Sequence, residues 1–201
     1  MKKLIFLATA LILGVVFNAG TCTPMDAEEG VEIGGVIWAT CNVGAPGKFV
    51  ATPSDAGMFY QWNRKKGWPA TGDVKGWPTT LAEGTIWAAT NDPCPRGWHV
   101  PTVIQLDLLA AASKSYASYS GVNGVYFGTA PNQIFLPAAG MRSGSLGSDV
   151  ESVGVTGYYW SIDPSVSDNA TAYMLFFWTG SMGVPPWPKS VGLSVRCVKK
   201  N

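Results

Sequence analysis

A chain of 201 residues with 14 basic and 13 acidic side chains carries almost no net charge. This balance excludes strong electrostatic binding to nucleic acid, which depends on clustered Lys and Arg side chains that neutralise phosphates. Glycine (24 residues), proline (14) and tryptophan (9) are abundant, and only 13% of the residues are charged. The composition favours one folded domain with an aromatic core and rigid loops over a disordered chain.

The first 21 residues have the pattern of a secretory signal peptide. Lys2 and Lys3 precede an uncharged apolar run that extends to Phe17, and small residues follow it. A membrane-spanning helix needs about 20 apolar residues, and Asn18 ends this run too early. We therefore expect export to the cell surface, the outer membrane or the medium, with processing just before Cys22. Cleavage there leaves 12 basic against 13 acidic side chains.

Cys22 is open to two interpretations. The preceding Ala19-Gly20-Thr21 resembles a bacterial lipoprotein box, in which the cysteine becomes the lipidated N-terminus of the chain. The same small residues equally suit a signal peptidase that leaves Cys22 unmodified. Lipid on Cys22 would leave Cys41 as a buried thiol, whereas an unmodified Cys22 could form a disulfide with Cys41. The sequence leaves both open.

The N-terminal part of the domain predicts a hairpin and a helix. Residues 22–30 are polar and acidic and predict a flexible lead-in, so the folded domain is expected over residues 31–201. Two short β-rich runs around Gly34-Gly35 predict a hairpin. A first helix is expected from Pro53, because the apolar residues at 58, 59 and 62 fall near one helical face.

The clearest helix begins at Thr102. Thr102 and Gln105 form a capping-box pair, and an apolar stripe that includes Leu106 and Leu109 continues to near Ser113. Short strands are then expected over residues 133–137, 157–161, 172–178 and 193–199. The predicted fold class is therefore α+β, with two helices, short antiparallel strands and long irregular loops.

The four cysteines stand at positions 22, 41, 94 and 197, without the CxxC spacing that is typical of zinc or redox sites. Outside the cytoplasm disulfides persist. We favour a Cys94–Cys197 bridge, which would join the turn before the main helix to the last strand. This bridge would close a loop of about 100 residues, worth about 4–5 kcal/mol in the chain-entropy model.

Five motifs occur in an order that is typical of a known family. They are IGGVIWAT (33–40), DPCPRGWHVPT (92–102), FLPAAG (135–140), YYWS (158–161) and SVRCV (194–198). By these motifs the chain resembles the Fibrobacter succinogenes major paralogous domain family of exported proteins, found mostly in Bacteroidota. The resemblance implies a C-type-lectin-like fold, in which a disulfide between the main helix region and the last strand is usual. It implies no particular activity, because that fold hosts binders, enzymes and structural modules.

The sequence contains no recognisable catalytic or metal-binding set. His99 is the only histidine, and one histidine builds neither a metal site nor a catalytic triad by itself. We expect His99 to hydrogen-bond within its turn, and Asp92 to accept backbone amides there. The chain is therefore not expected to be an enzyme or to need a cofactor or a metal.

Eight of the nine tryptophans divide into two groups. Four lie in regular elements or motif turns and are expected in the core: Trp38, Trp62, Trp98 and Trp160. Four others lie in or beside loops rich in glycine and proline: Trp68, Trp77, Trp178 and Trp187.

Aromatic residues in a rigid loop before the last strand give the strongest indication of function. Trp178, Met182, Trp187 and Lys189 are close together there, and three prolines restrict the backbone. Rigid aromatic anchors bind partners at little entropic cost. We therefore expect these four residues to bind a glycan or protein ligand, in a non-catalytic surface binding or adhesion module. The alternative is a structural subunit or tip component of a fimbria-like surface assembly. We expect no nucleic-acid partner, and membrane attachment only through lipid on Cys22.

Overall fold

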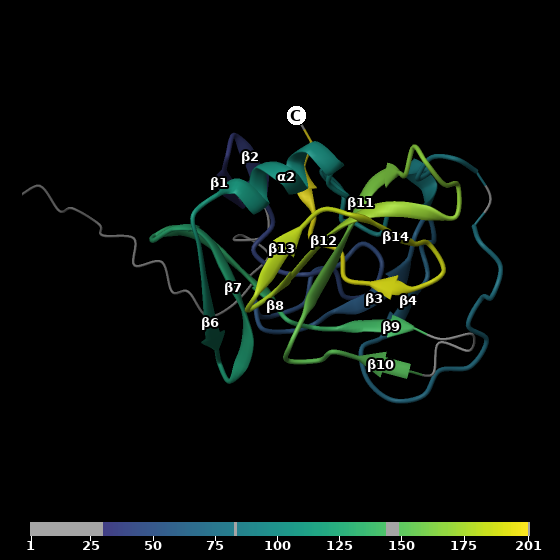
Figure 1. Ribbon diagram of the computed structural model, residues 1–201, viewed down its shortest axis with the longest axis horizontal. Coiled ribbons are helices and arrows are strands. Elements are labelled where there is room, and N and C mark those ends of the chain that lie inside the picture. Colours follow the sequence, from purple (N-terminus) through teal and green to yellow (C-terminus); the bar gives the residue numbers. More distant parts are fainter. Residues whose placement is uncertain (1–29, 83, 144–148, 201) are drawn as a thin grey trace, which may run out of the picture.

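The computed structural model describes residues 30–82, 84–143 and 149–200 (Figure 1). Of these residues 43% lie in strands and 7% in helical turns, and the arrangement is β-sandwich-like. The predicted α+β class, with two helices and a C-type-lectin-like fold, is therefore wrong. The predicted signal peptide (1–21) and lead-in (22–30), apart from Gly30, lie outside the described residues, as does Cys22.

The described strands form four sheets, and the strands of each sheet are named here in the order in which they lie side by side. The first contains β1 (Val31–Ile33), β2 (Val36–Trp38), β16 (Val198–Lys199) and β5 (Trp98–His99). The second contains β10 (Asp149–Glu151), β9 (Met141–Ser143), β15 (Gly192–Leu193), β3 (Met58–Gln61) and β4 (Gly67–Pro69). The third contains β11 (Gly157–Pro164), β12 (Thr171–Trp178) and β13 (Ser181–Gly183), with β14 (Pro186–Pro188) also paired to β12. The fourth contains β6 (Lys114–Tyr119), β7 (Val122–Thr129) and β8 (Asn132–Pro137).

Helical structure is limited to the 3-10 turn η1 (Ala89–Asn91) and the helix α2 (Val103–Ala111) among these residues. α2 forms as predicted. The Gln105 N–H donates to the Thr102 hydroxyl, and the Thr102 N–H donates to the Gln105 side chain, which completes the capping box. Figure 1 shows α2 above the strands of the third sheet.

The predicted hairpin at the start of the domain is confirmed. β1 and β2 pair antiparallel with Val31 opposite Trp38. Gly34 and Gly35 connect them with φ angles of 61° and 76°, in the left-handed region that a two-residue hairpin turn of this kind requires.

The predicted helix after Pro53 is wrong, because residues 58–61 form β3. Gly57 precedes the strand with a φ angle of 74°, and β3 then pairs with β4 on one side and β15 on the other. Phe59 and Tyr60 are both buried, although consecutive residues of a strand face opposite sides. Apolar residues spaced in this way suit either a helix face or a strand that is covered on both faces, so the pairing partners decide between them.

The predicted last strand is divided. β15 pairs with β3 and β9, whereas β16 pairs with β2 and β5. Between them Ser194 bridges to Tyr159 in β11. All residues from 192 to 198 are buried, so this segment runs through the interior between three sheets.

The Cys94–Cys197 disulfide is confirmed, and it joins residues 103 positions apart with a Cα–Cα distance of 6.0 Å. It ties the turn before α2 to the buried segment between β15 and β16. Cys41 is buried and is also disulfide-bonded. The alternative that left Cys41 as a buried thiol is therefore wrong.

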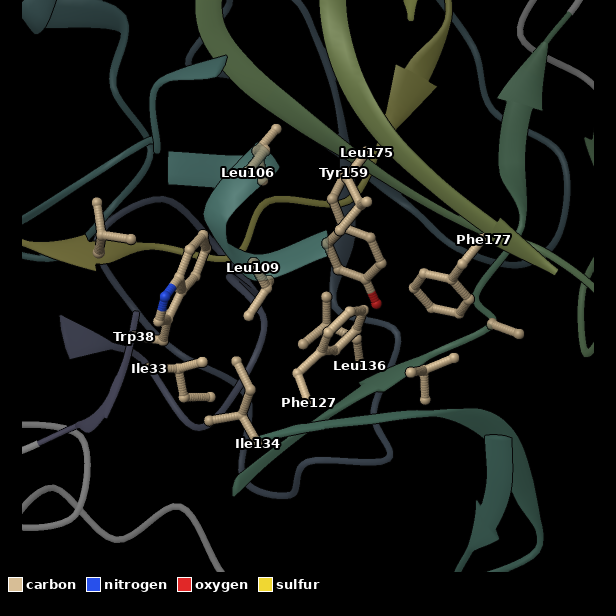
Figure 2. Close-up of a cluster of buried hydrophobic side chains, with 13 residues drawn as sticks. Ile33, Trp38, Leu106, Leu109, Phe127, Ile134, Leu136, Tyr159, Leu175 and Phe177 are labelled. Carbon is tan, nitrogen blue, oxygen red and sulfur yellow. The ribbon is translucent and has the colours of Figure 1, made fainter. Parts of the chain in front are cut away.

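Two buried clusters form the core. Figure 2 shows the first, in which Leu106 and Leu109 of α2 lie between Trp38 and Tyr159. The second contains the three other tryptophans predicted for the core: Trp62, Trp98 and Trp160. Trp68, which lies in β4, and Trp77 are buried too, with their ring centroids 5.2 Å apart.

Candidate functional site

The two faces of the third sheet pack differently. Tyr159 of β11 lies opposite Leu175 of β12, and both belong to the first core cluster. Tyr158 lies opposite Phe176, one position along each strand. Because side chains alternate along a strand, Tyr158 and Phe176 project from the other face of the sheet.

That other face contains a hollow of about 310 Å³, which we call the aromatic hollow. It is lined by Thr156, Tyr158, Met174, Phe176, Trp178, Pro185 and Trp187. The pairing of Trp187 with Ala172 places its side chain on the same face as Trp178, six residues further along β12. Two of the four predicted ligand-binding residues are therefore brought together, by two different strands.

Trp187 is held against Tyr158. The two rings are nearly parallel, with their centroids 6.3 Å apart and an angle of 24° between their planes. Trp187 is half-buried, and its indole Nε1 has no hydrogen-bond partner within the described part of the chain.

Trp178 is 45% exposed at the end of β12. Its ring covers Gly180, where an added Cβ would come within 2.6 Å of the ring. The tight turn to β13 therefore provides a surface for the indole, and Trp178 still leaves much of its own surface open to a ligand.

Met182 lies on the opposite side of the sheet. It pairs with Phe177 in the β12–β13 register and packs against the first core cluster. Because Phe177 is buried in that cluster, Met182 faces away from the aromatic hollow.

Lys189 is buried, with 4% of its surface exposed. Its Nζ donates to the Asn169 carbonyl oxygen at 2.8 Å and lies 4.1 Å from the centroid of the Trp62 ring. Burial lowers the pKa of Lys189, against a smaller opposing effect of Asp168. The lysine ties the strand end after β14 to the second core cluster.

Sequence reasoning missed Tyr158, Phe176 and Pro185 as parts of this surface. The only available signal was the alternation along β12, and it is ambiguous because both alternating sets are apolar. One set contains Met174, Phe176 and Trp178, and the other contains Tyr173, Leu175 and Phe177. The pairing and packing of the sheet decide which set lines the aromatic hollow, and here it is the set with Met174, Phe176 and Trp178.

The turn before α2 is structural, as predicted. The Asp92 carboxylate accepts the N–H of Cys94 at 2.9 Å and the N–H of Val100 at 3.3 Å. Burial raises the pKa of Asp92, and these two hydrogen bonds lower it less. His99 Nδ1 lies 2.8 Å from the Val100 carbonyl oxygen.

Within residues 30–82, 84–143 and 149–200, no group of three or more His, Cys, Asp or Glu side chains is arranged to hold a metal ion. The same residues include no helix that is long and apolar enough to cross a membrane. No family model, curated protein or solved structure matches this chain. Its resemblance to the major paralogous domain family therefore stays a prediction from the five motifs.

Proposed function

We propose that this protein is an exported binding protein that holds a neutral saccharide in the aromatic hollow. The observation that carries the proposal is the convergence of four aromatic side chains on one face of the third sheet: Tyr158, Phe176, Trp178 and Trp187. Aromatic ring faces pack against apolar surfaces such as the C–H faces of sugars. Export is expected from the N-terminal pattern.

The lining chemistry supports a neutral ligand. All seven residues around the hollow are uncharged, and they include the hydroxyl groups of Thr156 and Tyr158. Largely apolar walls with a few polar groups are typical of small-molecule sites, where the polar groups fix the orientation of the ligand. A saccharide has both the apolar ring faces and the hydroxyl groups that such a surface can engage.

The hollow is also held in shape before a ligand arrives. β11 and β12 pair in continuous register from Gly157 to Trp160, and Trp187 is stacked on Tyr158. Side chains that are already ordered lose little entropy on binding. Weak saccharide contacts can therefore contribute to affinity without a large ordering cost.

The test is a screen of neutral oligosaccharides, followed by calorimetry with the best binder. Loss of a central aromatic anchor typically costs about 2 kcal/mol, roughly thirtyfold in affinity. Trp187→Ala and the more exposed Trp178→Ala should each weaken binding by at least about tenfold. Val166→Ala, at an apolar residue that is 94% exposed and does not line the hollow, is the matched control and should bind as the wild type does.

Two outcomes would contradict the proposal. The first is that the protein binds none of the neutral saccharides, whether or not a protein ligand binds instead. The second is that Trp178→Ala, with an unchanged melting temperature, binds the saccharide as tightly as the wild type. Because Trp187 is half-buried, its variant is interpreted only alongside Trp178→Ala.

A further inference from the structure

β6 is an exposed edge strand. Within the described residues it pairs only with β7, and residues 114–118 are all exposed. Figure 1 shows β6 at the periphery of the molecule, at the lower left. Its outer edge therefore presents backbone amide and carbonyl groups that no strand of the described chain satisfies.

The hairpin geometry identifies these groups. Ser120 and Gly121 form the two-residue turn, with φ angles of 51° and 81°. In such a hairpin the residues that flank the turn, Tyr119 and Val122, exchange hydrogen bonds, and every second residue of β6 does so as well. The backbone groups of the residues between them, at positions 114, 116 and 118, point to the free edge.

This edge has few of the features that normally prevent strand addition. Natural edge strands are protected by proline, bulges, short length or repeated charges. β6 runs without a register shift from Lys114 to Tyr119, contains no proline, and has Lys114 as its one charge. Such a strand is suited to accept another strand through backbone hydrogen bonds.

We infer that a second copy of this chain pairs with β6, strand to strand and antiparallel, about a two-fold axis at Tyr116. In this register Tyr116 faces its own counterpart, and Lys114 of each copy faces Ser118 of the other. The two lysines are therefore kept apart, and each lies opposite a neutral hydroxyl group. Like charges directly opposite one another would destabilise the pair. Two copies of β6 can therefore pair in this register without charge repulsion. Residues 114, 116 and 118 of each strand would together form about six backbone hydrogen bonds.

Apolar side chains beside the edge support burial there. Tyr116 is 41% exposed and lines a second hollow of about 480 Å³ together with Val155 and Phe177. The neighbouring Val153 and Val155 are 61% and 62% exposed. Exposed apolar groups of this kind mark interaction surfaces, and a second copy paired at β6 would lie next to them.

The test is the oligomeric state of the purified mature chain, measured by light scattering and sedimentation at protein concentrations up to about 1 mM. We expect a dimer that dissociates on dilution. Tyr116→Lys would place two ammonium groups opposite one another, and Ser118→Pro would remove an outward N–H. Each should weaken dimerisation at least about tenfold, because a tenfold loss of affinity requires a loss of only about 1.4 kcal/mol of binding free energy. Ile104→Lys, at a helix residue that is 69% exposed, is the charge-matched control and should leave the dimer intact.

Hydrogen exchange locates the interface. The amides of Tyr116 and Ser118 should become protected as the protein concentration rises, whereas those of exposed loops should not. A wild-type protein that is monomeric throughout overturns the inference. So does a dimer that persists in folded Tyr116→Lys and Ser118→Pro variants. The saccharide test concerns a different sheet, so each proposal can fail without the other.

Discussion

Replacing Arg196 with methionine should remove one of the main supports of the fold. Arg196 is fully buried between β15 and β16. Its guanidinium donates to the Asn42 side-chain oxygen at 2.9 Å and to three backbone carbonyls, those of Ala39 (3.1 Å), Thr40 (2.8 Å) and Phe135 (2.9 Å). One side chain thus connects the last segment of the chain to the residues after β2 and to β8.

The expected loss follows from these four acceptors. Methionine has an unbranched apolar side chain but donates no hydrogen bond, and each buried group left without a partner costs about 1–3 kcal/mol. An opposing effect comes from the charge, because burial disfavours the cation and lowers the pKa of Arg196 to about 10. We therefore expect the lower end of the range, a loss of about 4 kcal/mol. This is a large part of the stability of about 5–15 kcal/mol that is typical of a protein.

Urea unfolding at neutral pH, followed by tryptophan fluorescence, measures this loss. Arg196→Lys keeps the cation but offers its three donors from a single nitrogen, so it should fall between the wild type and Arg196→Met. Arg96→Met, at an exposed arginine, is the matched control and should change the free energy of unfolding by less than about 0.5 kcal/mol. If Arg196→Met lost less than about 1 kcal/mol, the hydrogen-bond argument would be refuted.

Three other predictions concern stability. Cys94→Ser should lower the free energy of unfolding by about 4–5 kcal/mol, because the disulfide closes a loop of 103 residues; a loss below about 1 kcal/mol in urea would contradict this. Burial raises the pKa of Tyr60 and raises that of Tyr159 to about 12, so both should ionise after the other tyrosines when phenolate absorbance is followed. The unfolded chain releases these protons near pH 10, so the free energy of unfolding should fall as the pH rises from about 10 to 12. The lowered pKa of Arg196 acts in the opposite direction, but the two tyrosines outweigh it. A constant free energy of unfolding over that range would contradict this prediction. Gly157→Ala should cost about 1–3 kcal/mol, because a Cβ there would clash with an aromatic ring of β12, and an unchanged melting temperature would count against this packing.

Local motifs were predictable because their partners are near in sequence. The turn at Gly34-Gly35 needs only two residues that adopt positive φ angles, and the capping box needs only Thr102 and Gln105. The turn at Asp92 is likewise closed by backbone amides two and eight residues away. The sequence indicated all three, and the structure contains them.

The fold class was predicted wrongly for a related reason. The apolar residues from Met58 to Trp62 suit a helix face or a buried strand, and no neighbour in sequence decides between these two. β3 forms because β4 and β15, the latter more than 120 residues away, supply its hydrogen bonds. The exposed strand β6 escaped prediction as well, since its sequence lacks the apolar alternation of a half-buried strand.

The residues of the candidate site were likewise predictable only in part. The sequence alone determined that Trp178 and Trp187 lie in a segment restricted by proline, next to the end of the chain. Only the tertiary structure decided that both face one hollow with Tyr158, that Met182 faces the core, and that the Lys189 ammonium group is buried against an aromatic ring. The physical reason is strand register: shifting a strand by one residue exchanges its two faces, and register is set by partners far away in the sequence.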